Sequence, residues 1–444
     1  MPALGNFMQF SRFQPAPQRI IIPPRRAGAR PIKRGEFAAD GCDMATGLIA
    51  PSRVCRPETP APTEFDPMID CPDMETLLQP VILPTSRGPD QRALLLYILH
   101  SGNLYGTERM ALSTAIGLRE QFRTILFAPP GAALTQAAES GLETRSFKSR
   151  WQLARGVREF LRLRRPVTFA CTSLTQWAVC ALLHTLYRVP SHHVQLVHGG
   201  AAGSGAYGRK KFLNWTGVQF ITVSDYARSR LVEGGVPADR VTVIHNFLPP
   251  ERIAAAPRRG PFTDTGIGKI LVVSRLDDLK RPHLLLDALD ARPELDELEI
   301  RIIGAGPEFD RIRNRCALRH PNVHLYGFSD NVPGDMAHSD LLVHTCPIES
   351  FGLVVLEAMA ADLPVLVPDA GGTGLIVRHG QNGFTFAADN AIDLADRLIE
   401  LRRASPDLLN GVVASARQTV IERYSAASAL DQYRRAFAPP APRA

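Results

Sequence analysis

Long apolar runs are absent from the 444-residue sequence, because no stretch reaches the roughly 18 residues that a membrane-spanning helix needs. The isoleucines at 20–22 are followed at once by Pro23 and Pro24, so the first residues also lack the apolar core of a secretory signal. We therefore expect a cytoplasmic protein, which at most lies against the inner face of the cytoplasmic membrane.

Paired cysteines are absent as well. The seven cysteines are scattered, with no CxxC pair and no metal-ligand spacing. An odd number of scattered cysteines is typical of reduced thiols and not of a disulfide framework. The sequence therefore predicts neither a disulfide scaffold nor a bound metal, and no other cofactor is indicated.

Concentrated positive charge and aromatic residues are both scarce. The net charge is +7 and aromatic residues make up 7% of the chain. Nucleic-acid recognition needs basic charge gathered beside exposed aromatics, or a recognisable module, and the sequence has neither. We expect no nucleic-acid partner. Anionic small molecules or lipid headgroups explain the positive charge as well.

Residues 1–90 lack a hydrophobic period and are crowded with proline, which predicts a disordered N-terminal extension. The alternative is a polybasic arm that touches anionic lipid, because a basic run precedes the acidic residues that begin at Glu36. The basic run consists of Arg12, Arg19, Arg25, Arg26, Arg30, Lys33 and Arg34.

From Ala93 onward, apolar runs of strand length alternate with amphipathic stretches of helix length, as in ALLLYIL, RTILFA, HHVQLV, KILVVS and DLLVHT. This alternation is typical of βα units on a parallel sheet. It predicts an α/β fold with two doubly wound, Rossmann-like domains over 91–250 and 269–424, joined by a linker over 251–268. Residues 425–444 are predicted to form a C-terminal helix that packs back on the N-terminal domain and ends in a frayed tail. Such sheets bind ligands at the carboxyl ends of their strands, so we expect the site in the cleft between the domains.

The segment TCPIESFGLVVLEAMA contains the most specific pattern. A buried strand is followed by a short loop and by a helix that is expected to begin near Phe351. The amides of Phe351, Gly352 and Leu353 would then point outward from a helix N-terminus, which is a natural anion site.

Two glutamates flank this junction. Glu349 comes just before the predicted helix and Glu357 lies inside it. Carboxylates accept paired hydrogen bonds, which suits the adjacent hydroxyls of a hexose or a ribose. The alternative is that Glu349 only favours the helix dipole and that Glu357 is a solvated helix charge.

A second strand-to-helix junction lies in KILVVSRLDDLKRPHLLLDAL. Arg275 follows the strand and Lys280 falls near the next helix start, where Pro282 suits the first turn. Two cations at the carboxyl end of a strand are suited to a diphosphate, especially one that leaves and gains charge. The alternative is that both serve surface solubility.

The spacing of Glu349 and Glu357 around SFG, preceded by the SRL…K segment, resembles glycosyltransferase family 4, whose members are retaining enzymes with the GT-B fold. The resemblance extends over about residues 93–437. It implies that Glu349 contacts the donor sugar, that Glu357 contacts the ribose, and that Arg275 and Lys280 hold the diphosphate.

Further site residues follow from the same resemblance. IIGAGPE resembles the family's turn near the nucleotide base, and HSGNLYGTERM resembles its glycine-rich acceptor-side loop. His198, at the end of HHVQLV, matches a histidine near the reacting sugar; the alternative is a structural histidine. The implied catalytic set is therefore Arg275, Lys280, Glu349 and His198. The implied donor-binding set is Gly106, Gly304, Gly306, Ser350, Phe351, Gly352, Leu353 and Glu357.

The sequence departs from the family pattern at several positions. Tyr105 replaces the first of two glycines, Thr345-Cys346 replaces a proline-serine pair, and Leu375 stands where a glutamate is usual. Metal-dependent sugar transferases hold the diphosphate through an Asp-x-Asp motif and a divalent cation. The sequence contains no Asp-x-Asp, so we expect a metal-independent enzyme.

Residues 149–165 form a predicted basic amphipathic helix, with Leu153, Val157 and Phe160 on its apolar face. It is expected either to pack on its sheet or to contact an anionic membrane, as would suit a lipid-linked acceptor.

The sequence thus predicts a retaining glycosyltransferase that moves a hexose-type sugar from a nucleotide-diphosphate-sugar donor to a glycan, lipid-linked or small-molecule acceptor. Two alternatives remain. One is another GT-B enzyme, such as an epimerase or a phosphorylase, and the other is an inactive sugar-nucleotide-binding scaffold protein.

Overall fold

The computed structural model describes residues 90–199, 205–255 and 257–439. The extension predicted over 1–90 lies outside the described residues apart from its last position, and so does the end of the predicted C-terminal tail.

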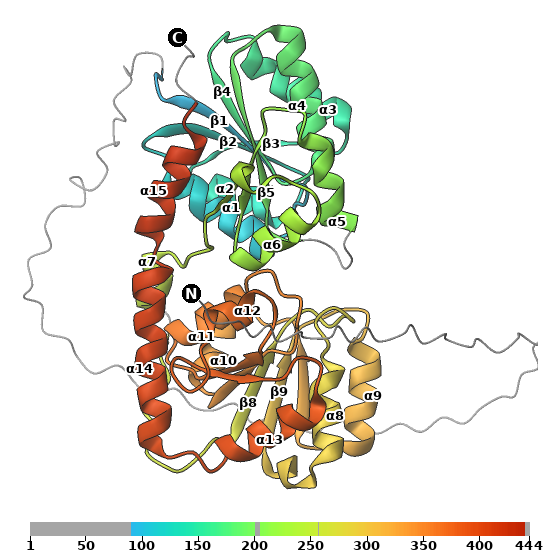
Figure 1. Ribbon diagram of the computed structural model, residues 1–444, viewed down its shortest axis with the longest axis vertical. Helices are drawn as coiled ribbons and strands as arrows, with labels where there is room; N and C mark the ends of the chain where they lie inside the picture. The colour runs from blue at the N-terminus through green and yellow to red at the C-terminus, as the bar shows by residue number, and fades with distance from the viewer. Residues whose placement is uncertain (1–89, 200–204, 256, 440–444) are drawn as a thin grey trace, which may run out of the picture. The chain divides into compact units, whose positions relative to one another are not determined.

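The N-terminal half of the described chain forms a seven-stranded parallel sheet in the order β3-β2-β1-β4-β5-β6-β7 (Figure 1). The order reverses between β1 and β4, which is where doubly wound sheets bind ligands. The strands are β1 (Ala93–Ile98), β2 (Phe122–Ala128), β3 (Glu143–Ser146), β4 (Val167–Cys171), β5 (Ser191–Val197), β6 (Gln219–Thr222) and β7 (Val241–Val243). The helices are α1 (Gly106–Gly117), α2 (Ala132–Glu139), α3 (Arg150–Leu161), α4 (Leu174–Tyr187), α5 (Gly205–Gly208), η2 (Arg209–Leu213), α6 (Asp225–Glu233) and η3 (Ala238–Arg240).

The C-terminal half forms a six-stranded parallel sheet in the order β10-β9-β8-β11-β12-β13, which reverses between β8 and β11. The strands are β8 (Lys269–Val273), β9 (Glu299–Ile303), β10 (Val323–Gly327), β11 (Leu341–Val343), β12 (Val365–Pro368) and β13 (Phe384–Phe386). The helices are α8 (His283–Ala291), η4 (Pro293–Glu297), α9 (Phe309–Arg319), α10 (Val332–Ala337), α11 (Leu353–Ala360), α12 (Gly371–Ile376) and α13 (Ala391–Leu401).

Two parallel sheets with alternating helices confirm the predicted α/β fold of two Rossmann-like domains. The sequence patterns did not reveal β3, β7 and β13, which are short strands at the edges of the sheets. β3 has the sequence ETRS and so contains no apolar run. Edge strands need fewer apolar residues because one side of each has no neighbouring strand.

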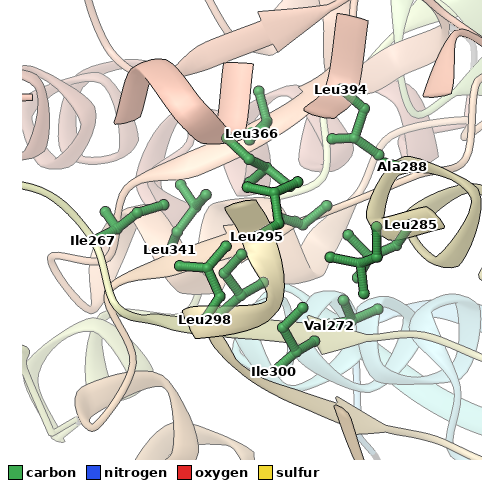
Figure 2. Close-up of a cluster of buried hydrophobic side chains, with 14 of the residues drawn as sticks. Ile267, Val272, Leu285, Ala288, Leu295, Leu298, Ile300, Leu341, Leu366 and Leu394 are labelled. Atoms are coloured by element: carbon green, nitrogen blue, oxygen red, sulfur yellow. The ribbon is translucent and has the colours of Figure 1, made fainter. Parts of the chain in front are cut away.

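A leucine-rich core holds β8 and β11 in place, and Figure 2 shows its side chains gathered between the sheet and its helices. Each of these side chains is almost completely buried, and such burial contributes roughly 1.5–3 kcal/mol per residue. The strand and helix residues that meet there include Val272, Ile300, Leu341, Leu366, Leu285 and Leu394. The core therefore fixes the two strands whose carboxyl ends carry the candidate site.

The last helices are α14 (Pro406–Arg423) and α15 (Ala426–Phe437), which follow one another in red in Figure 1. Phe437 packs edge-to-face on Tyr97 and Phe122, with ring centroids 6.2 and 6.4 Å apart, and its carbonyl accepts a hydrogen bond from Thr168 Oγ1 at 2.8 Å. The end of the described chain thus packs on the first sheet.

The segment expected to be a linker begins with a helix, α7 (Pro250–Ala255). Proline in the first turn and Glu251 beside it both favour a helix start. The prediction of a linker did not take these two residues into account.

The apolar face of the basic helix α3 is buried against the first sheet, where Leu153, Val157 and Phe160 belong to the core. This face therefore packs on its sheet, as one of the two alternatives predicted, and any membrane contact of α3 would have to use its polar side. In the part of the chain that is described, no helix is both long enough and apolar enough to cross a bilayer.

Candidate functional site

The candidate residues lie at the carboxyl ends of strands in both sheets. His198 directly follows β5, Gly304 directly follows β9, and Arg275 comes just after β8. Glu349 lies in the loop that leaves β11. Because β8 and β11 are neighbours, their two loops lie next to each other.

Lys280 and Glu349 form an ion pair between these loops, with Lys280 Nζ in contact with Glu349 Oε2. Their side chains are only 24% and 18% exposed. Two side chains fix the backbone of the lysine loop from the other side. Thr345 Oγ1 donates to the carbonyl of Lys280 at 2.7 Å, and Cys346 Sγ donates to that of Leu279 at 3.1 Å. Thr345 and Cys346, which replace the proline-serine pair of the family pattern, thus hold the lysine in place.

Both members of the pair are charged at neutral pH. Burial by itself raises the pKa of Glu349. The nearby Lys280 ammonium lowers it by more than burial raises it, so the pKa lies below the usual carboxyl value. Burial likewise favours neutral Lys280, but the attraction of Glu349 outweighs it and raises the pKa of the ammonium. The site therefore presents a fixed cation beside a fixed carboxylate.

A buried histidine completes this cluster. His344 is 4% exposed and its Nε2 lies 3.6 Å from Glu349 Oε2, which is longer than a hydrogen bond. Burial lowers the pKa of His344 to about 4, so its ring is neutral at neutral pH. Ligand atoms of His344, Cys346 and Glu349 lie within 4.8 Å of one another, a spacing that could hold a metal ion. These residues fit a cation poorly, because the Lys280 ammonium already contacts Glu349 and burial raises the pKa of Cys346 to about 11.

Arg275 does not join this pair but forms an ion pair with Asp277 through its Nε. The other oxygen of Asp277 accepts a hydrogen bond from the Lys280 amide at 3.1 Å. Asp277 therefore contacts both candidate phosphate-binding residues.

Gly304 and Gly306 lie against the backbone that carries Arg275. A Cβ at Gly304 would lie 1.8 Å from the carbonyl oxygen of Ser274, and one at Gly306 would lie 2.2 Å from that of Leu276. Only glycine allows this approach. In this structure both glycines support the arginine loop.

Helix α11 begins at Leu353, just after the expected start near Phe351, and Gly352 is its N-cap. Gly352 has φ +96°, so the chain turns sharply there before the helix starts. The outward amides are then those of Leu353 and Val354. Phe351 is 2% exposed and its ring packs edge-to-face on Tyr424 at 5.7 Å. Its side chain therefore serves packing.

The glutamate loop also contacts the N-terminal half of the chain. Ser224 Oγ donates to the carbonyl of Ser350, and the hydroxyls of Tyr207 and Ser350 lie 3.4 Å apart. A Cβ at Gly199 would lie 3.0 Å from Ser350 Oγ, which places His198 and its neighbour beside this loop.

His198 is neutral at neutral pH, since burial lowers its pKa to about 4. Both ring nitrogens are buried and have no hydrogen-bond partner among the residues that the structure describes. A buried polar group without a partner is costly, and such groups often serve a ligand.

Glu357 faces a cavity of about 860 Å³. Arg252 of α7 pairs with its Oε1 at 3.0 Å, and burial raises the pKa of the carboxyl while Arg252 and Arg109 partly offset this. The volume is within the range of small-molecule sites. Gly106 and Leu353 also line the cavity, and a Cβ at Gly106 would lie 3.3 Å from Leu353 Cδ1. The apolar lining comes from Phe328, Val332, Pro333 and Met336.

Sequence reasoning missed three residues of this site, namely Arg252, Asp277 and His344. Asp277 lies within a motif that the sequence did single out, so its position was a usable signal. Arg252 gave no signal, because it lies in the expected linker and meets Glu357 only in the folded chain.

Two family models match the chain. "Glycosyltransferase Family 4" matches residues 105–252 and "Glycosyl transferases group 1" matches residues 258–418. Together they extend over most of the described residues.

Among proteins with similar sequences is an N-acetyl-alpha-D-glucosaminyl L-malate synthase of Bacillus anthracis, 30% identical over 37% of this chain. Another is a phosphatidyl-myo-inositol mannosyltransferase of Mycobacterium leprae, 29% identical over 49% of it. The matches extend over 44% and 58% of those relatives, so the chain spans about half of their length.

Among solved structures, Anabaena HepE in complex with UDP and glucose matches with a TM-score of 0.64 at 21% identity, over 76% of this chain and 97% of the other. This likeness shows the fold.

Proposed function

Because the chain belongs to the glycosyltransferases of the family 4 type with the GT-B fold, we propose that it moves a hexose-type sugar from a nucleotide-diphosphate-sugar donor to an acceptor, with retention of anomeric configuration. The acceptor is a glycan, a lipid-linked molecule or a small molecule. The similar HepE structure contains UDP and glucose, and the relative from M. leprae is named for transfer to a phosphatidyl-myo-inositol, which supports a nucleotide donor and admits a lipid acceptor.

The observation that carries this proposal is the Lys280–Glu349 ion pair at the start of α11. As the sugar–phosphate bond breaks, negative charge develops on the departing diphosphate. Lys280, Arg275 and the amides at the start of α11 stabilise that charge. Glu349 accepts hydrogen bonds from the sugar hydroxyls, and Glu357 accepts those of the ribose.

The remaining candidates surround the reacting centre. His198 presents a neutral ring beside the loop of Ser350, and Gly106 allows the donor to approach the start of α11. The leaving phosphate accepts the proton of the attacking hydroxyl, because none of these side chains is placed as a dedicated base. Two fixed cations and helix amides serve the leaving group, so the proposed mechanism needs no metal ion.

A thermal-unfolding screen with UDP-, GDP- and ADP-sugars tests donor binding. A ligand at 100 times its Kd stabilises the native state by about 2.7 kcal/mol, so one nucleotide series should raise Tm clearly. If no nucleotide sugar raises Tm, donor binding at this site is contradicted. Conversion of the donor alone into an epimer would favour the epimerase alternative, and binding without any turnover would favour the inactive scaffold.

Donor affinity is expected to depend on pH through Glu357. Its pKa is raised by burial, and the ribose needs the ionised carboxylate as acceptor. Affinity is therefore full above this pKa and falls as pH decreases through it. Arg252→Gln removes a cation that lowers the pKa, so the acidic limb of a Kd–pH curve should move to higher pH. In Arg258→Gln, which loses an ion pair with Asp362 instead, the limb should stay in place. If donor affinity falls at the same acidic pH in both variants, this role of Glu357 is contradicted.

A further inference from the structure

Helix α4 presents an apolar stripe to solvent. Ala178, Leu182 and Leu186 are spaced four residues apart and are all exposed, with Leu182 and Leu186 at 62% and 67%. The helix contains no Asp, Glu, Lys or Arg. Surface helices usually place charged residues on the side away from the core, so an outward leucine stripe indicates a contact surface.

Basic helix α3 lies on one side of α4. The two helices lie side by side (Figure 1). They contribute to one core, which contains Val157 of α3 and is contacted by Val179 of α4. With its apolar face buried, α3 turns Arg155, Arg158 and Arg162 to solvent, and none of these three forms an ion pair in the described structure. The leucine stripe is therefore bordered by positive charge.

Exposed aromatic residues border α4 on the other side. Leu213 of η2 belongs to a hydrophobic cluster against which Leu174 and Trp177 of α4 also pack, so η2 is the next element of this layer. Phe212 and Trp215 are 69% and 96% exposed, beside the exposed Lys211. Tryptophan with an adjacent lysine is a usual anchor at a membrane–water interface, and Phe212 adds exposed apolar surface beside it.

We propose that the outer face of α3, α4 and η2 binds the surface of an anionic lipid bilayer. This inference rests on the proposed transferase function and selects, among its acceptors, the lipid-linked class. The arginines are complementary to anionic headgroups, and the leucine stripe and the two aromatics enter the acyl boundary. A second copy of the chain on this face would bring like charges together. Nucleic acid would use the aromatics and the arginines but not the aliphatic stripe.

The test is co-sedimentation of the full chain with vesicles of phosphatidylcholine alone or mixed with phosphatidylglycerol. We expect binding to the anionic vesicles only, weakened by salt. The double variant Leu182→Glu and Leu186→Glu should lower the partition coefficient at least about tenfold, and Trp215→Ala should lower it several-fold. The control is Leu318→Glu, which places the same charge on a leucine of α9 that is even more exposed, at 85%, and it should bind as the unmodified chain does.

Two outcomes overturn the proposal. In the first, the double variant binds vesicles as tightly as the control, which places any lipid contact elsewhere, for example in residues 1–90. In the second, light scattering shows a dimer that the double variant dissociates, which makes the stripe a contact between copies. The donor-induced rise in Tm is measured on every variant. If it is absent from the unmodified chain, the proposed function fails; if it is present and vesicle binding is absent, only the membrane surface fails.

Discussion

Lys280→Ala is expected to reduce kcat on the order of 10²–10³-fold, the usual loss when one preorganised group at a developing negative charge is removed. In the proposed donor complex Lys280 contacts the diphosphate, and in the structure its ion pair keeps Glu349 ionised. The matched control is Lys269→Ala, because Lys269 is exposed at the opposite end of the same strand, β8. Steady-state kinetics with the donor that raises Tm provide the comparison. Equal kcat values in the two variants would contradict the assignment.

Loss of stability must be separated from loss of catalysis in this experiment. Lys280→Ala leaves Glu349 without its partner, and breaking a buried pair can cost about 3–5 kcal/mol, less here because both side chains are partly exposed. A double variant, Lys280→Met with Glu349→Gln, removes both charges and should recover most of the stability. It should stay inactive, because the leaving group still lacks its cation.

Gly352→Ala is expected to reduce turnover about 100-fold, since a shift of about 1 Å in a catalytic group can cost that much. Gly352 has φ +96°, and a Cβ there would lie 2.5 Å from Cγ2 of Thr373, which is completely buried. The strand-to-helix turn must therefore move, and with it Glu349 and the amides of α11.

Two further variants isolate the steric cause. Gly380→Ala has a similar φ of +70° but meets nothing within 4 Å, so it should show only the backbone strain of about 1 kcal/mol and near-normal turnover. Adding Thr373→Ser to Gly352→Ala removes the clashing methyl group and keeps the hydroxyl that donates to the carbonyl of Ala370, so activity should partly return. If Gly380→Ala loses as much activity as Gly352→Ala, the clash with Thr373 is not the cause.

The overall fold was predictable because the strands of a buried parallel sheet have continuous apolar sequences. Runs such as those at β1 and β8 are bounded by glycine, proline and polar residues, which marks them as strands of doubly wound domains. The strands at the sheet edges were not predictable, because β3 is polar and β7 and β13 have three residues each. The start of α11 was placed too early because the positive φ of Gly352 depends on tertiary packing.

The pairing of site residues was only partly predictable. The carboxylates and cations stand out in the sequence through two strand-to-helix junctions and a family resemblance. Contacts between distant segments cannot be recognised in the sequence. The ion pair of Arg252 with Glu357, for example, depends on how α7 packs against α11. The sequence predicted one donor site with two cations, whereas the structure joins Lys280 to Glu349 and Arg275 to Asp277.

The most direct test of the account is sugar transfer by Glu349→Ala, followed as release of the nucleoside diphosphate from the donor that raises Tm. Glu349 is the proposed acceptor of the sugar hydroxyls and the ion-pair partner of Lys280, so its replacement removes that acceptor and leaves the lysine without its partner. We predict that the variant stays folded and still shows donor binding through Glu357, but that transfer falls by at least about 100-fold. Transfer that persists unchanged in Glu349→Ala would contradict the site and the mechanism built on it.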